Sequence, residues 1–429
     1  MKELKETPWG AIPEQWSVST IAEQSSVVTD YVANGSFAAL AENVKYKSEE
    51  DVAVLIRLVD FNNGFKGDFV FIDQQAYEFL GKSKLFGEEI IISNVGANVG
   101  TVFKCPKLKY KMSLAPNSIM VKFKGDNDFY YYWFKSKQGQ QMLQSIVTGS
   151  AQPKFNKTNF KELLVPVPPI DEQKRISRIL RSIDDKIELN NRINHNLEEQ
   201  AQALYRSWFV DFEPFKNEEF AESEMGMIPS SCHIQKLQDL CDVVTKGTTP
   251  TSIGFSFTDA GIPFIKVECI REDHVLEGSK CAFIDSETHS ALLRSQIRPR
   301  DILFTIAGTL GRFCLMPDYI KEANTNQAVC IIRVNPNAIP VDYLYSLFLG
   351  RYHVDYCSKN VQQAVQANLS LGTLKNLPIL IPGQEKLKEY TESIRPIISA
   401  MELRKEETRQ LINCRDSLLP RLMNGSLTC

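Results

Sequence analysis

Histidines are the first residues to consider for chemistry, because an imidazole can act as a general base or as a metal ligand. The five in this sequence are His195, His233, His274, His289 and His353. They are scattered, and none lies in a carboxylate or cysteine cluster at metal-ligand spacing. We interpret each as a surface or packing residue.

Motifs for phosphate binding and nucleophilic catalysis are also missing from the sequence. It contains no GxGxxG, no GxSxG and no Asn-Pro-Pro-aromatic stretch. The nearest approach to a P-loop is Gly81-Lys82-Ser83, where Ala76 stands in place of the first glycine. We therefore expect no catalytic residues, no bound metal and no cofactor on this chain.

Charge is distributed unevenly along the chain. The net charge is only -3, but residues 82–161 hold thirteen lysines against four acidic residues, or +9. Residues 280–375 carry +3, and residues 171–224 carry -5. A polyanion responds to the local electrostatic field of a protein surface rather than to the net charge of the whole chain. The region 82–161 is therefore a candidate nucleic-acid surface.

Composition indicates a cytoplasmic protein of two to four domains. The chain has 429 residues, of which 43% are hydrophobic and 24% charged, as in average globular proteins. No apolar run reaches the roughly 18 residues of a membrane helix, and we expect neither a signal peptide nor contact with a membrane. Nine of the ten cysteines lie in 232–429 without a CxxC pair, so we interpret them as free thiols.

The sequence repeats itself at about half its length. Residues 10–13 recur at 226–229, 91–100 at 302–311, and 152–168 at 366–382, always in the same order. A period this long excludes a solenoid and indicates a duplicated domain. The alternative is that the three pairs of segments match by chance, because strands and turns use similar residues.

Both halves have the same expected order of elements: β-rich runs, a helical patch, a strand bounded by prolines and a long helix. The expected strands are Val52–Ile56, Phe69–Ile72, Glu89–Ser93, Ser118–Phe123, Asp301–Thr305 and Ala328–Ile332. The helical patches are Tyr130–Gln144 and Val341–Tyr356, and the proline-bounded strands are Leu163–Pro168 and Leu377–Pro382.

Two long helices with apolar heptads follow these strands, over 171–208 with Asp171 as N-cap and over 384–422. The predicted contact residues are Ile176, Ile183, Ile187, Asn190, Leu197, Leu204, Leu387, Ile394, Met401, Leu411 and Leu418. The heptad residues form an apolar stripe on each helix that must be covered by another element. Because a globular half of the chain separates the two helices, we expect them to pair antiparallel. Asn190 either fixes the register within the stripe or is solvated at its edge. The alternative is that each helix packs only on its own domain.

Several segments of the chain resemble type I restriction–modification specificity subunits. They are the Gly-x-Ile-Pro opening of each half and the runs Asp171–Ile176, Asp184–Asn190, Gln202–Phe212 and Leu418–Leu422. The resemblance covers the whole chain, repeat included. The second helix departs from the pattern, since Lys386–Tyr390 replaces the pair Arg175-Ile176, which puts the equivalence of the two partner sites in doubt.

The resemblance implies an α+β fold in which two repeated β-rich target-recognition domains are separated by two long helices that form an antiparallel coiled coil. It implies that each domain reads half of a split sequence in double-stranded DNA. It further implies two methyltransferase subunits and restriction–translocase subunits as partners, in the cytoplasm of a bacterium or archaeon. The methyl donor, ATP and Mg would then bind to those partners, and this chain would be non-catalytic.

On this reading the domains follow the repeat. The first recognition domain is expected at 1–169, the central helix at 170–212, a linker at 213–225, the second domain at 226–383, and the C-terminal helix at 384–429.

Residues that contact DNA are expected among the cations and amides of the loops, because cations meet phosphates and amides meet base edges. In the first domain these are Lys104, Lys107, Lys109, Lys111, Gln152, Lys154, Asn156 and Lys157. In the second domain they are Arg312, Asn324, Asn326, Gln327, Gln363, Gln366 and Asn368. Taken singly, each is more readily a solvated loop residue, so the clusters are better candidates than their individual members.

Two other functions stay open at this point. A stand-alone DNA methyltransferase or nuclease with an unrecognised site would bind a methyl donor or cleave DNA without partners. A purely architectural coiled-coil adaptor would not bind DNA, which the basic region 82–161 argues against.

If the two recognition domains are held apart by the helices, the length of the helices should set the distance between the two half-sites. Four residues inserted between Asn196 and Tyr205 lengthen the first helix by about 6 Å, which corresponds to one or two base pairs at about 3.4 Å each. We expect an active, folded insertion variant to keep both half-site sequences and to lengthen the spacer by one or two base pairs, as read from its DNA methylation motif. An unaltered spacer in such a variant would show that the helices do not set the distance.

Overall fold

The computed structural model describes residues 4–360 and 368–427, which form two compact units. The first unit comprises residues 1–187 and 410–429, and the second comprises residues 188–409. Two helices of 40 residues, α8 (Ile170–Phe209) and α13 (Gln384–Met423), contribute to both units. Among the described residues, no helix combines the length and the apolar character needed to cross a membrane.

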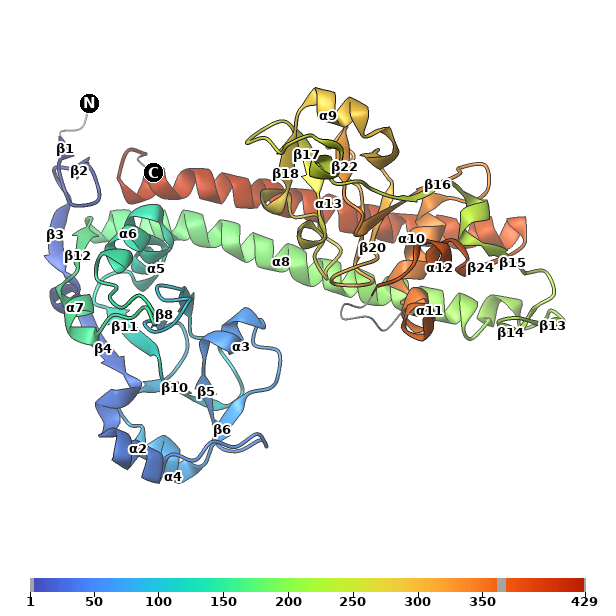
Figure 1. The fold of residues 1–429 in the computed structure, drawn as a ribbon. Coiled ribbons are helices and arrows are strands. Elements are labelled where there is room, and N and C mark those ends of the chain that lie inside the picture. Colours follow the sequence, from blue (N-terminus) through green and yellow to red (C-terminus); the bar gives the residue numbers. More distant parts are fainter. Residues whose placement is uncertain (1–3, 361–367, 428–429) are drawn as a thin grey trace. The chain divides into compact units, whose positions relative to one another are not determined.

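The first unit is built from short strands and helices that precede α8 (Figure 1). The strands are β1 (Leu4–Lys5), β2 (Ile12–Pro13), β3 (Ser17–Thr20), β4 (Ser25–Asp30), β5 (Ala53–Ile56), β6 (Val70–Ile72), β7 (Lys84–Leu85), β8 (Ile90–Ser93), β9 (Val102–Lys104), β10 (Lys111–Leu114), β11 (Ser118–Phe123) and β12 (Leu164–Val167). The helices are α1 (Ile21–Gln24), α2 (Phe37–Asn43), α3 (Leu58–Asn62), α4 (Gln74–Phe79), α5 (Asn127–Lys135), α6 (Lys137–Ser145) and α7 (Lys157–Glu162).

The second unit repeats this composition between α8 and α13. Its strands are β13 (Phe220–Ser223), β14 (Gly226–Pro229), β15 (His233–Lys236), β16 (Cys241–Lys246), β17 (Ile262–Ile265), β18 (Ala282–Ile284), β19 (Gln296–Ile297), β20 (Ile302–Thr305), β21 (Phe313–Leu315), β22 (Ala323–Thr325), β23 (Val329–Val334) and β24 (Pro378–Ile381). Its helices are α9 (Ser286–Ala291), α10 (Val341–Leu349), α11 (Tyr352–Asn360) and α12 (Leu371–Lys375).

Sheet topology shows that the second unit is a copy of the first. The order β4-β11-β8-β9 corresponds to β16-β23-β20-β21, and β6-β5-β10-β7 corresponds to β18-β17-β22-β19. In each second sheet the two middle strands run parallel, β5 with β10 and β17 with β22. Because matched strand orders include the same parallel pair, the duplication predicted from the sequence is confirmed.

The long helices pair antiparallel within each unit. In the second unit Asn190 donates to Glu407 at 2.9 Å, and the rings of Trp208 and Tyr390 lie 5.3 Å apart. In the first unit Arg415 donates to Asp184 at 3.0 Å. As the residue number on α8 increases, the residue number of the contacting residue on α13 decreases, which confirms the predicted antiparallel pairing. In Figure 1, α8 and α13 run side by side.

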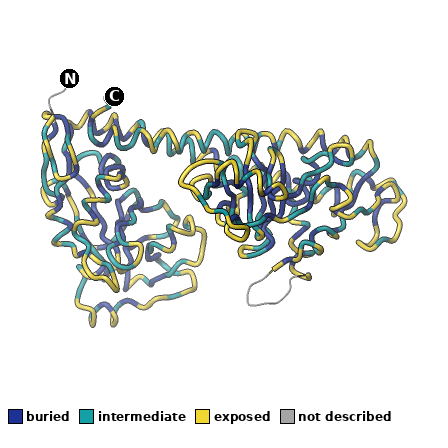
Figure 2. The backbone as a smooth tube through the Cα atoms, turned by 45° about the horizontal axis from the view of Figure 1, so that its top comes forward, coloured by how far each residue is buried: buried dark blue, intermediate teal, exposed yellow. Residues whose placement is uncertain are grey.

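Burial along the contact stripe is uneven. Asn190 is fully buried rather than solvated. Of the other predicted contact residues, those buried are Ile176, Leu387, Ile394 and Met401, and those partly exposed are Ile183, Ile187, Leu197, Leu204, Leu411 and Leu418. Figure 2 shows the result as a mixture of buried, intermediate and exposed turns along the helices. By contrast, strands β5, β8 and β20 are buried at every residue.

Three local predictions differ from the structure. Asp171 lies inside the first turn of α8 rather than at its N-cap, since the helix begins at Ile170 directly after the proline pair. Each helical patch is two helices, broken at Ser136 in the first unit and at Gly350 in the second. The expected linker 213–225 contains β13, which pairs antiparallel with β14, the strand that follows the linker.

Gly350 provides a steric test of how α8 packs in the second unit. A Cβ at this position would stand 2.3 Å from the ring of Tyr205 on α8, whereas one at Gly372 would meet nothing closer than 3.7 Å. We expect Gly350→Ala to lower the free energy of unfolding by about 1–3 kcal/mol, the cost of overpacking, and to lower the melting temperature accordingly. Gly372→Ala is the control and should leave it unchanged or raise it. Equal melting temperatures for the two variants would contradict the close packing of Tyr205.

Candidate nucleic-acid interface

A glycine-containing turn follows the same strand in each unit. In the first unit the turn after β8 holds Gly96 and Gly100, with φ of 100° and 91°. In the second unit the turn after β20 holds Gly308 and Gly311, with φ of 77° and 82°. Glycine adopts these left-handed conformations without the steric cost that other residues bear, so the sequence enforces the same sharp turn twice.

Each turn is hydrogen-bonded to the segment in which the sequence places amide side chains. Val95 forms a β-bridge with Lys154, and the amide of Gly96 donates to the carbonyl of Pro153 at 2.9 Å. In the second unit Ala307 forms the corresponding bridge with Asn368. The structure therefore brings together two features that are far apart in the sequence. We call residues 94–101 with 152–157 the first turn surface, and residues 306–312 with 368–370 the second turn surface.

The first turn surface presents three of its four predicted polar residues to solvent. Gln152, Lys154 and Asn156 are exposed. The Asn156 side chain also caps α7 by accepting from the amide of Asn159 at 2.8 Å. Lys157 is half-buried, and its Nζ lies 2.9 Å from Asp30. Lys154 is thus the cation of this surface with no ion pair to the described residues.

The four lysines from the last residue of β9 to the first residue of β10 face groups of their own unit. Nζ of Lys104 lies 2.6 Å from Asp128, and its side chain is 21% exposed. The other three are exposed, with Lys107 3.2 Å from Glu88, Lys109 3.3 Å from Glu50, and Lys111 donating to Gln74 at 3.1 Å. Lys104 is thus the least exposed of the four lysines, and the carboxylate of Asp128 matches its charge.

The second unit engages several predicted residues internally. Arg312 lies 2.6 Å from Glu272, and the Asn326 side chain accepts from the amide of Ala328 at 3.1 Å. Asn324 is fully buried on β22, where its side chain hydrogen-bonds to His289 and to the carbonyl of Leu292. Asn324 is a correction to the predicted set, because a fully buried and satisfied amide has no access to DNA.

Other predicted positions of the second unit remain exposed or lie outside the described residues. Gln327 is exposed, although it accepts from Thr249 at 2.6 Å, and Asn368 is exposed on the second turn surface. Gln363 and Gln366 fall in the range 361–367, outside the described residues.

Residues near Gln327 were missed by the sequence argument. The amide of Thr248 donates to the carbonyl of Thr325 at 3.1 Å, and Arg294 donates to the Thr248 hydroxyl at 3.0 Å. This places Arg294 and a Gly-Thr-Thr-Pro turn at 247–250 beside Gln327. The turn composition was visible in the sequence, but the approach of Arg294 from a distant segment was not.

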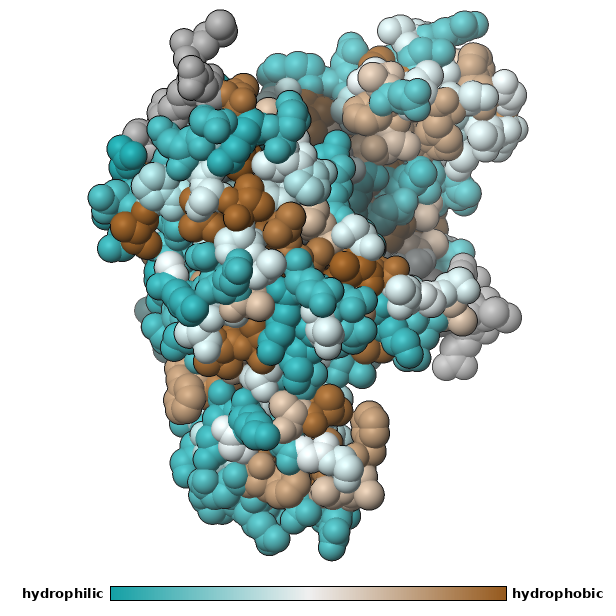
Figure 3. Space-filling view, turned by 90° about the vertical axis from the view of Figure 1, so that its left-hand side faces the viewer, coloured by the Kyte–Doolittle hydropathy of each residue, from teal (hydrophilic) through white to brown (hydrophobic). Residues whose placement is uncertain are grey.

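The aromatic run 130–134 belongs to the core rather than to a base-stacking surface. Tyr130 stacks on Phe123 with ring centroids 3.9 Å apart, and Trp133 meets Trp9 edge-on at 5.1 Å. On the face of the first unit that Figure 3 shows, apolar side chains form separate groups among hydrophilic ones.

Comparison with known proteins identifies the family. The model of the type I restriction modification DNA specificity domain matches residues 13–199 and again residues 229–413. The chain belongs to this family. Both copies of the domain lie where the sheet orders repeat.

Relatives of similar length come from archaea and bacteria. The type I restriction enzyme MjaIX specificity subunit of Methanocaldococcus jannaschii is 26% identical over 440 residues, which covers 99% of this chain and 96% of that protein. The EcoKI specificity subunit of Escherichia coli is 21% identical, with 98% and 90% covered. The S subunit of a type I restriction–modification system from M. genitalium has the same fold, with a TM-score of 0.55 at 16% identity over 95% of this chain and 96% of that one.

Lys154, which has no ion pair to the described residues, and Lys104, which is paired with Asp128, should affect the salt dependence of DNA binding by this specificity subunit differently. Lys154→Ala should weaken binding to duplex DNA and reduce the slope of log K against log salt by about one, because one phosphate contact is lost. Lys104→Ala is the matched control and should leave the slope unchanged, since that charge is matched by Asp128. The measurement is a titration of full-length protein with duplex DNA at several salt concentrations. Equal slopes for the two variants would contradict the assignment of the first turn surface.

Proposed function

We propose that this specificity subunit reads a bipartite target in double-stranded DNA, with one recognition domain for each half. The observation that carries the proposal is the repetition of the turn surface, since both domains bond a glycine turn to a segment with exposed amide groups. Amide side chains distinguish bases in the major groove by their paired donors and acceptors. The two turn surfaces share a backbone arrangement but carry different side chains, which suits the recognition of two different half-sites.

The distribution of charge supports two separate roles for the polar residues of the first domain. Some attract the DNA phosphates, and others contact the DNA directly. The first domain carries the +9 region at 82–161, and the exposed lysines at 107, 109 and 111 keep part of that field at the surface, although each has a neighbour within its unit. Long-range attraction to phosphates requires the field rather than a vacant ammonium group. These lysines therefore draw DNA to the domain, and Gln152, Lys154 and Asn156 contact it.

The chain is proposed to recognise DNA while partner subunits perform the chemistry. Its relatives are named specificity subunits of type I restriction enzymes, and a specificity subunit implies other subunits that modify and cut. We propose two methyltransferase subunits bound along α8 and α13, joined by restriction–translocase subunits. The methyl donor, ATP and Mg then bind to those partners, and the complex acts in the cytoplasm, where chromosomal DNA lies.

A domain exchange tests whether the halves are read independently. Replacing residues 226–380 by the matching block of a related specificity subunit should change one half of the methylated motif and leave the other half as it was. The reciprocal exchange of residues 10–165 is the control and should change the opposite half. The readout is sequencing of modified bases in cells that also express the methyltransferase subunits. A change in both halves after a single exchange would contradict independent reading.

The alternative of a stand-alone enzyme gives the opposite result in a simple assay. The purified full-length chain should neither methylate nor cleave duplex DNA in the presence of a methyl donor, ATP and Mg, and activity should appear when the partner subunits are added. Turnover that stays with the chain through successive purification steps would establish the stand-alone enzyme.

A further inference from the structure

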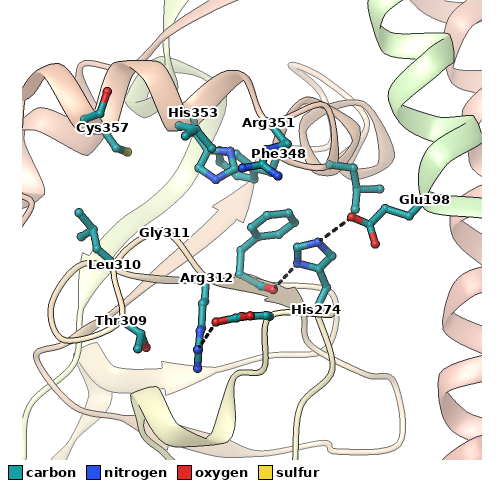
Figure 4. Close-up of a pocket in the computed structure, with 15 residues that line it drawn as sticks. Glu198, His274, Thr309, Leu310, Gly311, Arg312, Phe348, Arg351, His353 and Cys357 are labelled. Carbon is teal, nitrogen blue, oxygen red and sulfur yellow. Dashed lines mark hydrogen bonds and ion pairs between the residues drawn. The ribbon is translucent and has the colours of Figure 1, made fainter. Parts of the chain in front are cut away.

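Among the described residues, the second turn surface has no cation that is free of an ion pair. Arg312 lies 2.6 Å from Glu272, and Figure 4 shows its guanidinium beside this carboxylate. The first turn surface, in contrast, presents Lys154 to solvent. A cation that contacts DNA from the second domain is therefore expected on a neighbouring segment.

A turn of sequence Gly-Thr-Thr-Pro at 247–250, here called the threonine turn, adjoins the second turn surface. The amide of Ile306 on that surface donates to the carbonyl of Ala328 at 2.9 Å. The amide of Gly247 donates to the carbonyl of Asn326 at 3.0 Å. Because Asn326 and Ala328 are two residues apart, the threonine turn and the second turn surface flank one short loop.

Two residues fix the shape of the threonine turn. A Cβ at Gly247 would stand 1.9 Å from the carbonyl oxygen of Thr325, so glycine alone allows the two backbones to approach this closely. Pro250 is buried, and its ring restricts the backbone angle φ. The two threonines between these positions are thus presented by a backbone with little freedom.

Each threonine of the turn holds one exposed side chain from a distant segment. Nη2 of Arg294 donates to the hydroxyl of Thr248 at 3.0 Å, and the guanidinium forms no ion pair with the described residues. The hydroxyl of Thr249 donates to Oε1 of Gln327 at 2.6 Å. A guanidinium has five N–H donors, and an amide oxygen has a second lone pair. Arg294 and Gln327 are therefore oriented by the turn and still able to bind a ligand in solvent.

Arginine and glutamine are two of the side chains that distinguish bases most clearly. In the major groove an arginine pairs with O6 and N7 of guanine, and a glutamine pairs with N6 and N7 of adenine. A side chain that is already held by a hydroxyl group loses less conformational entropy when it binds. The threonine turn thus presents two base-reading groups in defined positions.

The first unit uses the corresponding turn differently. By sheet order, β4 matches β16 and β7 matches β19. After β4, the Asn34 side chain accepts from the backbone amide of Lys82 at 2.8 Å and donates to the hydroxyl of Ser83 at 2.8 Å. This contact holds the segment before β7, but the side chain of Lys82 takes no part in it. Reading by side chains that this turn orients is therefore specific to the second domain.

We propose that Arg294 and Gln327 read bases of the second half-site in the major groove, Arg294 a guanine and Gln327 an adenine. Thr248 and Thr249 are the positioning residues that orient them. The inference rests on the proposed DNA-reading function, and it names the residues that determine specificity in the second domain. Arg294 also supplies the unpaired cation that the second turn surface does not provide.

The test is the methylated motif of cells that express the full-length chain, or a variant of it, with its methyltransferase subunits. Arg294→Lys should relax one guanine position of the second half-site, because lysine keeps the charge but loses the paired donors of the guanidinium. Thr248→Val removes the hydroxyl and should relax the same position. Gln327→Ala and Thr249→Val should both relax one adenine position. Thr251→Val is the matched control and should leave the motif unchanged, since this exposed threonine makes no side-chain hydrogen bond with the described residues.

Duplex binding by the purified complex with its methyltransferase subunits gives the size of the effect. Replacing the guanine in the duplex should weaken binding by the wild type about 5- to 150-fold, and should weaken binding by Arg294→Lys less. Lys82→Ala, in the first domain, should relax no position of the motif, because its side chain is not held by Asn34.

Three results would overturn the proposal. They are a wild-type second half-site without guanine, an unchanged motif in both Arg294→Lys and Thr248→Val, and a loss of affinity in Arg294→Ala that is equal for all duplexes, which would assign Arg294 to a phosphate. The first half-site, which should stay as it is in every variant, shows that the variant is folded. If the wild-type motif still has two halves, the DNA-reading function survives any of these results, so the two failures are distinguishable.

Discussion

The structure depends on covering the apolar stripes of two helices of 40 residues. Most of the stability of a helix in a folded protein comes from packing of its apolar face rather than from its helix propensity. Here each helix supplies the cover for the other, as the contacts of Asp184 with Arg415 and of Trp208 with Tyr390 show. Neither helix is therefore a simple linker, because the stability of each depends on a helix that is distant in the sequence, with Asp184 and Arg415 lying 231 positions apart.

The same helices anchor the β-rich domains through buried and partly buried polar contacts. In the first unit Trp16 donates to Glu172 at 2.9 Å, and Tyr132 donates to Asp184 at 2.8 Å. In the second unit Lys405 of α13 donates to the carbonyl of His274 at 2.9 Å. Such contacts are directional, so they orient a domain on its helix as well as holding it there. Within each unit, these contacts hold the β-rich part of the chain against a long helix.

Much of the fold could be predicted from the sequence because its signals are local. Heptad spacing gave both helices to within one residue at their ends, and the repeated blocks gave the matching sheets. Side-chain partners could be predicted less well, because they come from distant segments. Lys104 and Lys154 are equivalent in the sequence argument, yet Asp128 neutralises the first, and no described carboxylate pairs with the second. Asn324 follows a loop in the sequence but lies on a central strand of its sheet, between β17 and β19.

The central claim is that two copies of one domain read two halves of a DNA target. It is tested most directly by sequencing modified bases in the DNA of cells that express this chain with its methyltransferase subunits, against cells that express those subunits alone. The account predicts a new methylated motif of two defined blocks separated by an undefined spacer of constant length. A single uninterrupted motif, or methylation that does not depend on this chain, would contradict it.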